Sequence, residues 1–107
     1  MVLSEQAKGS TTMDGTEQDL FTSYTNLAYY QAYVFLHNME ADDKIIIRVY
    51  VNDPQTSTER LYIETPYYGV QTDTTKYIPS LPTDSYRITC EQESGTYRAV
   101  TWILYDI

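Results

Sequence analysis

The side chains best suited to nucleophilic, acid–base or metal chemistry are scarce in this sequence. His37 and Cys90 are the single histidine and the single cysteine of the 107-residue chain. Neither has a partner at a spacing typical of zinc ligands. No Gly-x-Ser-x-Gly segment presents a serine nucleophile to the histidine. The sequence therefore predicts no catalytic residue, no bound metal and no cofactor.

Acidic residues are more numerous, but their pattern does not favour a site. Glu40, Asp42 and Asp43 form one short cluster, and the alternating oxygen ligands of a calcium loop around a glycine are absent. We interpret this cluster as a solvated turn. Pairs of carboxylates at a suitable separation are common in any acidic protein, so they do not by themselves indicate a glycoside hydrolase. We expect the chain not to be an enzyme.

The charge balance excludes several classes of partner. The chain has 15 Asp and Glu against 7 Lys and Arg, which gives a formal net charge of -8. Nucleic-acid binding depends on clustered basic residues, and anionic membrane surfaces repel an acidic protein. No apolar run approaches the ~20 residues that span a bilayer, and the first residues lack the apolar core of a signal peptide. We expect a soluble protein with neither nucleic-acid nor membrane partners.

The elements that would position any site are predicted to be strands. Twelve of the residues are Tyr, and Thr is also abundant; both favour a pleated, half-buried surface. Residues 1–17 are polar and lack either hydrophobic period, so we expect a flexible N-terminal arm followed by one domain over 18–107. Short apolar runs separated by turn residues are typical of a β-sandwich. The expected strands cover residues 19–23, 28–36, 44–51, 60–65, 67–71, 75–78, 85–91 and 99–105.

This pattern predicts an all-β fold, an antiparallel β-sandwich of about eight strands with jelly-roll or immunoglobulin-like topology. Glu93–Thr96 is predicted to be the hairpin loop between the last two strands. In the connection over residues 37–43, Met39 is expected to plug the core. Cys90 alternates in phase with Ile88, which favours a small buried hydrophobe, and Glu91 and Glu93 disfavour a reactive thiolate.

Several of the expected strands carry large apolar residues on both faces. One face should form the core, with these candidate residues: Val34, Leu36, Met39, Ile45, Ile47, Val49, Ile88, Cys90, Val100, Trp102 and Leu104. A sandwich needs only one apolar face per strand, so the other face should be covered by a loop, by the arm or by another subunit. Tyr is enriched at protein interfaces because it offers contact area at low entropic cost. The candidate interface residues are Tyr29, Tyr33, Tyr50, Tyr67, Tyr68, Ile103 and Tyr105.

Several segments together resemble a group of small proteins encoded among the structural genes of tailed phages and related viruses. The segments that carry the resemblance are 14–20 (DGTEQDL), 36–39 (LHNM), 45–50 (IIIRVY), 91–92 (EQ), 95–98 (GTYR) and Trp102-x-Leu104-Tyr105. The resemblance spans nearly all of residues 14–105 and concerns strand and turn positions, so it transfers no functional residue. At Ala41-Asp42-Asp43 the pattern would have a glycine, and the turn type there is left open.

The resemblance implies a virion component, most simply a capsid decoration or minor structural protein assembled in the host cytoplasm. Its partners would be other copies of itself or other virion proteins such as a capsid lattice, where many weak contacts give firm attachment. Two alternatives remain open: a carbohydrate- or host-surface-binding module that uses the same aromatics, and a small acidic inhibitor of a nucleic-acid-binding enzyme.

Overall fold

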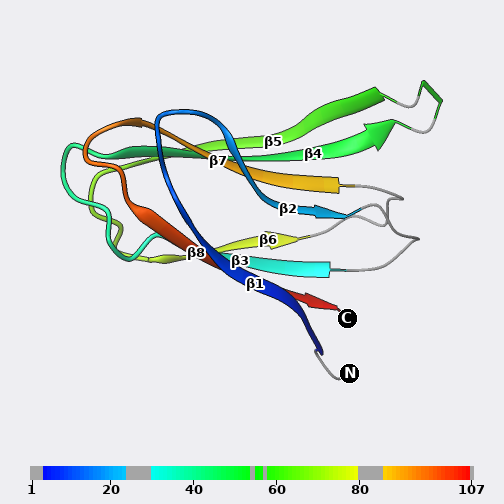
Figure 1. The fold of residues 1–107 in the computed structure, drawn as a ribbon, viewed down its shortest axis with the longest axis horizontal. Helices are drawn as coiled ribbons and strands as arrows, with labels where there is room; N and C mark the ends of the chain where they lie inside the picture. The colour runs from blue at the N-terminus through cyan, green and yellow to red at the C-terminus, as the bar shows by residue number, and fades with distance from the viewer. Residues whose placement is uncertain (1–3, 24–29, 54, 57, 80–85, 107) are drawn as a thin grey trace.

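The described residues form eight β-strands arranged in two antiparallel sheets (Figure 1). The computed structural model describes residues 4–23, 30–53, 55–56, 58–79 and 86–106, so the candidate interface residue Tyr29 lies outside the described residues. The strands are β1 (Ser4–Thr12), β2 (Gln18–Ser23), β3 (Tyr30–Phe35), β4 (Lys44–Asp53), β5 (Thr58–Tyr68), β6 (Thr75–Pro79), β7 (Tyr86–Ser94) and β8 (Ala99–Asp106). The expected all-β architecture of two packed sheets is confirmed.

The strand order is β1-β8-β3-β6 in one sheet, called sheet A, and β2-β7-β4-β5 in the other, called sheet B. The pairs β1–β8, β2–β7, β3–β6 and β4–β5 are nested inside one another along the chain. Among consecutive strands, only β4 and β5 pair with each other as a hairpin. The loop after Ser94, expected to be a hairpin turn, instead carries the chain from β7 in sheet B to β8 in sheet A.

The core lies between the two sheets and is built mainly from side chains that alternate along the strands, although Ile46 of β4 and Thr89 of β7 are also buried on the opposite phase. Ile45, Ile47 and Val49 of β4 face Val100 and Leu104 of β8 across it, and all are buried. Every candidate core residue except Trp102 is buried. Trp102 is partly buried and packs against the same cluster. Alternation thus identifies the inward face of each strand because side chains of a strand point to opposite faces in turn.

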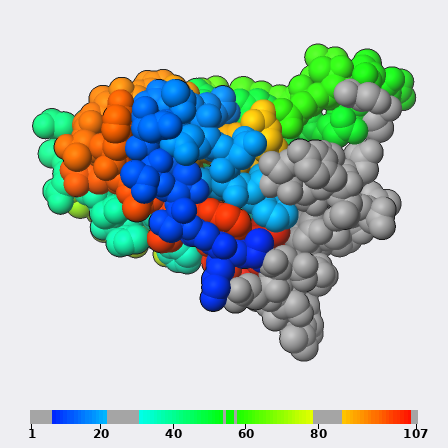
Figure 2. All heavy atoms as spheres, viewed as in Figure 1, coloured from blue at the N-terminus to red at the C-terminus, as the bar shows by residue number. Residues whose placement is uncertain are grey.

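The N-terminal segment differs from the expected flexible arm, because residues 4–12 form β1 and pair with β8 along its length. Figure 2 shows these blue residues packed beside those of the orange and red C-terminal strands. The strand escapes detection because its inward positions are small: Ala7 packs on the core, and Gly9 lies opposite Trp102. A Cβ at Gly9 would lie 3.0 Å from the Trp102 ring, so a side chain there would displace it. Met13, just after β1, is fully buried.

The edges of the sheets carry irregularities that disfavour pairing with another chain. The runs expected as two strands around Pro66 form the single strand β5, which tolerates proline because it lies at the edge of sheet B. Register shifts interrupt three edge strands: β1 between Glu5 and Ala7, β2 between Asp19 and Phe21, and β5 between Leu61 and Ile63. Such bulges twist an edge away from edge-to-edge association. The fourth edge strand, β6, has five residues.

Candidate functional site

The outer face of sheet A carries a cluster of aromatic and aliphatic side chains. We call it the aromatic face and define it by Tyr33, Phe35, Tyr77, Ile103 and Tyr105. The ring centroid of Tyr33 lies 5.4 Å from that of Tyr77 and 6.0 Å from that of Tyr105. Ring separations of this size are typical of favourable aromatic pairs. Three rings from three neighbouring strands therefore form one continuous contact surface.

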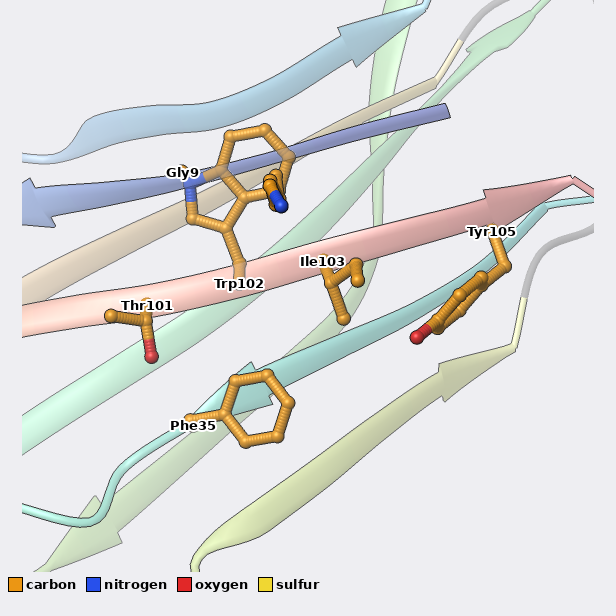
Figure 3. A pocket seen from close by; sticks show the side chains of 7 residues that line it. Gly9, Phe35, Thr101, Trp102, Ile103 and Tyr105 are labelled. Carbon is orange, nitrogen blue, oxygen red and sulfur yellow. The ribbon is translucent and has the colours of Figure 1, made fainter. Parts of the chain in front are cut away.

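A shallow hollow of about 510 Å³ opens beside these rings. It is lined by Lys8, Gly9, Phe35, Thr101, Trp102, Ile103 and Tyr105 (Figure 3). In the figure, Phe35, Thr101, Ile103 and Tyr105 project on one side of β3 and β8, whereas Trp102 is directed toward Gly9 on β1. The lining is predominantly apolar, so the hollow is suited to an apolar or aromatic group rather than to a strongly polar one.

The outer face of sheet A also contains charged residues at its β1 edge. Lys8 belongs to the lining of the hollow, and cross-strand register places Glu5 opposite Tyr105. The rings of Tyr33, Phe35 and Tyr77 are of residue types that are enriched in protein interfaces.

The outer face of sheet B has the opposite character. Its two arginines are held by five carboxylates: Arg48 pairs with Glu17, Glu64 and Glu91, and Arg87 pairs with Asp19 and Glu59. Tyr50 lies within this network, where its hydroxyl donates to Glu17 at 2.6 Å and its ring lies 4.5 Å from the Arg87 guanidinium carbon. The candidate interface residue Tyr50 therefore makes its contacts within the protein, as part of this ion-pair network.

Glu17 attaches the connection between β1 and β2 to this face. Its carboxylate accepts hydrogen bonds of 2.6 Å from both the Tyr50 and the Thr89 hydroxyls. Burial disfavours the charged form, but the two hydrogen bonds and the positive charge of Arg48 outweigh it and lower the pKa of Glu17. A lowered pKa in the folded state means that the ionised carboxylate stabilises the fold.

We expect Glu17→Gln to lower the free energy of unfolding at pH 7 by about 1 kcal/mol, because it weakens charge-assisted hydrogen bonds. The contribution of Glu17 is complete above its ordinary pKa of 4.5 and is lost as the pH falls through the lower folded-state value. Urea unfolding at pH 7 and at acidic pH should therefore show a smaller acid-induced loss for the variant. Glu40→Gln, at an exposed position, serves as control, and an equal effect of both variants would contradict the assignment.

The remaining candidate interface residues divide between the two faces. Tyr33, Ile103 and Tyr105 come together on the aromatic face. Tyr68 is 64% exposed at the end of β5, whereas its neighbour Tyr67 is turned inward and packs against the core. The expectation that one of this adjacent pair is exposed is met by Tyr68. Tyr67 does not lie on an open surface.

Five residues of the aromatic face and its hollow were not among the candidates: the small residues Gly9 and Thr101, and the larger Lys8, Phe35 and Tyr77. Phe35 alternates in phase with Tyr33, so the same pattern could have included it. Tyr77 faces Tyr33 across the β3–β6 pair, and its strand is short. Lys8 lies in β1, which has no apolar alternation. Only the pairing of their strands shows that Tyr77 and Lys8 lie on this face.

A buried polar cluster surrounds Asp43, at the end of the connection between β3 and β4. The acidic segment was expected to be a solvated turn; Glu40 and Asp42 are exposed, but Asp43 is buried. Its carboxylate accepts hydrogen bonds from the backbone N–H groups of Glu40 and Thr96 and from Arg98 Nε, at 2.8 to 3.1 Å. Gln92 Nε2 lies 3.4 Å away and donates to the carbonyls of Ser94 and Thr96. The Asp43 carboxylate therefore has its hydrogen-bond partners within the protein, which indicates a structural role for Asp43.

The single cysteine, Cys90, is buried in the core. Burial raises the pKa of the Cys90 thiol to about 12, so the thiolate is negligible at neutral pH. Within the described ranges, no group of three His, Cys, Asp or Glu side chains is arranged to hold a metal ion. The described residues include no helix long and apolar enough to cross a membrane.

Comparison with protein-family models, with curated proteins and with solved structures found no match to this chain. The functional interpretation therefore depends on the two faces and the polar cluster described above.

Proposed function

We propose that this chain is a non-enzymatic structural protein of a virion, a capsid decoration or minor component, that binds its neighbours through the aromatic face. The observation that carries the proposal is the contrast between the two outer faces. The outer face of sheet B presents paired charges that neutralise one another, whereas the outer face of sheet A presents the rings of Tyr33 and Tyr77 beside Ile103. An open apolar face bordered by polar residues is characteristic of a protein interaction site.

The topology supports a jelly roll as the finer description of the fold. A jelly roll is equivalent to one long hairpin of paired strands rolled into two sheets, and the nested pairs from β1–β8 inward to β4–β5 follow that order. Virus capsid proteins and lectins are among the proteins built on this architecture. Because a fold hosts many functions, the resemblance to phage structural proteins and the aromatic face supply the functional part of the proposal.

A face for protein contact is better supported than one for carbohydrate. Sugar sites combine aromatic rings with polar side chains that accept and donate hydrogen bonds. The hollow of this face is mainly apolar, and its polar side chains are those of Lys8, Thr101 and Tyr105. Apolar side chains such as Phe35 and Ile103 at the centre of the face match the core of a protein interface.

The experiment is to follow the full chain in an extract of its native source through a density gradient, with detection by mass spectrometry. We expect wild type in a fast-sedimenting particle fraction. Ile103→Asp should deplete this fraction about tenfold or more, as expected for a central interface residue. Val70→Asp, at a loop position that is 67% exposed, should not. Wild-type protein that sediments only as a free small protein would contradict the virion assignment.

A further inference from the structure

Two tyrosine rings of the aromatic face lie directly opposite each other on paired strands. Tyr33 of β3 and Tyr77 of β6 are cross-strand partners in the antiparallel register. In such a pair the Cβ atoms are about 5 Å apart and both side chains leave the sheet on the same side. The ring centroids are 5.4 Å apart, and the ring planes are inclined by 44°. The two rings are therefore in contact, although the residues are far apart in the chain.

This pair is accessible to a small oxidant in solution. Tyr77 is 51% exposed, and it lies on β6, an edge strand of five residues that pairs with β3 along one side. Tyr33 is partly exposed beside it. Exposed side chains move between rotamers within nanoseconds, so the two rings can tilt until their edges meet.

The orientation of the rings favours this pair over its neighbour. Tyr105 also contacts Tyr33, but its ring centroid is 6.0 Å away and the ring planes are inclined by 77°. In this edge-to-face arrangement the edge of one ring is directed at the face of the other, so the carbons next to the two hydroxyls do not meet. At an inclination of 44°, the edges of Tyr33 and Tyr77 can approach side by side.

The geometry points to a dityrosine site, at which a one-electron oxidant, such as a peroxidase supplied with hydrogen peroxide, joins Tyr33 and Tyr77 of the same chain by a carbon–carbon bond. Each phenol gives one electron to the oxidant and its hydroxyl proton to water, which leaves a neutral phenoxyl radical. The two radicals combine between the Cε carbons next to the hydroxyls. Each of these carbons then loses its proton, and each oxygen regains one. The product is lighter by two hydrogen atoms, and the peroxide is reduced to two molecules of water.

The sulfur-bearing side chains that the structure describes are shielded from this reaction. Oxidation of Cys and Met follows the exposure of the sulfur. Cys90, Met13 and Met39 are all buried in the core cluster, on the inner side of the sheets. Oxidising equivalents therefore remain with the exposed aromatic rings.

The bond secures the edge strand β6 to β3, which lies inside sheet A. A cross-link between residues far apart in the chain restricts the unfolded chain and so favours the folded state, as the chain-entropy model of disulfides describes. The inference is independent of the proposed function. The reaction takes place on the free chain and leaves both rings on the aromatic face, so a partner can still bind there.

Treatment of the dilute full-length protein with a peroxidase and hydrogen peroxide tests the site. We expect a monomeric product that has the blue fluorescence of dityrosine and a mass lower by two hydrogen atoms. Fragmentation of its cross-linked tryptic peptides should assign the link to Tyr33 and Tyr77. The yield per chain should not change on further dilution, because the reaction occurs within one chain. Links that form only between chains, or mainly at other tyrosines, would overturn the inference.

Matched Tyr→Phe variants identify the residues that react. Tyr77→Phe keeps the ring and its packing but removes the phenol, so it should lose the product within the chain. Tyr62→Phe is the control, because Tyr62 is 48% exposed and also lies on an edge strand, β5 of sheet B. Tyr105→Phe should likewise retain the product. Retention of the product by Tyr77→Phe, or its loss in either of the other two variants, would contradict the assignment.

Urea unfolding tests the effect of the bond on the fold. The linked wild type should unfold at a higher urea concentration than the untreated protein, and peroxidase-treated Tyr77→Phe should unfold at the same concentration as its untreated form. An equal shift in both proteins, or no shift in the linked wild type, would overturn the stabilising role of the Tyr33–Tyr77 bond.

Discussion

Replacement of Asp43 by Ala should lower the free energy of unfolding by about 3 kcal/mol or more, a large fraction of the stability of a domain of this size. Asp43 is 2% exposed and is the acceptor that holds three segments together. Removal of its carboxylate leaves the N–H groups of Glu40 and Thr96 and the Arg98 guanidinium without their acceptor. Donors left unsatisfied in a buried site cost more than the bond itself contributes.

The adjacent residue provides the control for this prediction. Asp42 carries the same charge but is exposed, and its backbone carbonyl, which accepts from the Ser94 hydroxyl, is unchanged in Asp42→Ala. Urea unfolding at pH 7 should show an effect below about 0.5 kcal/mol for Asp42→Ala, as for most surface substitutions. Similar losses for the two variants would refute the buried network as the source of stability.

The same carboxylate predicts acid sensitivity. Burial opposes its ionisation, but hydrogen bonds from the Glu40 backbone and from Arg98 outweigh burial and lower the pKa of Asp43. Its contribution is therefore present above the ordinary value of 3.8 and disappears as the pH falls through the folded-state pKa. Asp43→Ala should flatten the acid limb of the stability curve. Gly95 is required beside this carboxylate. Its φ of 93° favours glycine, and a Cβ at this position would overlap Asp43.

Leu104→Ala should destabilise the fold by about 3 kcal/mol through the cavity that it leaves between the sheets. Leu104 has no exposed surface and belongs to the core cluster, whereas its neighbour Ile103 points to the aromatic face. Ile103→Ala should cost about 1 kcal/mol in urea unfolding, because part of the side chain is already in contact with water. This comparison tests the orientation of β8 with two adjacent residues of equal size.

The two variants should also differ in association. Ile103→Ala should reduce the amount of protein in the fast-sedimenting particle fraction while the protein remains folded, and the folded fraction of Leu104→Ala should sediment as wild type does. If Ile103→Ala is the more destabilising of the two, the inward and outward faces of β8 are reversed and the aromatic face is misassigned.

Local pattern was sufficient for the inward faces of the strands. In β4, Ile45, Ile47 and Val49 are buried on one phase and Arg48 points outward, and Ile46 is the one residue of the outward phase that is also buried. Apolar alternation does not identify strands at the edge of a sheet. The N-terminal strand β1 is polar because backbone pairing with β8 holds it in place, and Pro66 interrupts the sequence pattern but not the edge strand β5.

The candidate site shows the same limit. The alternation of Tyr33, and of Ile103 with Tyr105, indicated that aromatic side chains point outward. It could not show on which sheet these side chains would instead be held by contacts within the protein. Tyr50 and Tyr33 have equivalent local sequence signals, yet Tyr50 contacts Glu17 and Arg87, whereas the ring of Tyr33 packs against Tyr77 and Tyr105. The partners of Tyr50 come from distant parts of the chain, which a local period does not register.

The sequence by itself determined the β class, the phase of most strands and the absence of a recognisable catalytic motif, because side-chain type and a period of two act within a few residues. Only the tertiary structure decided that the last turn crosses between sheets, that Asp43 is buried rather than solvated, and that Lys8, Ile103, Tyr33 and Tyr77 form one row. These features arise from pairing between residues far apart in the chain. Such pairing is set by the packing of the whole core, and no short segment encodes it.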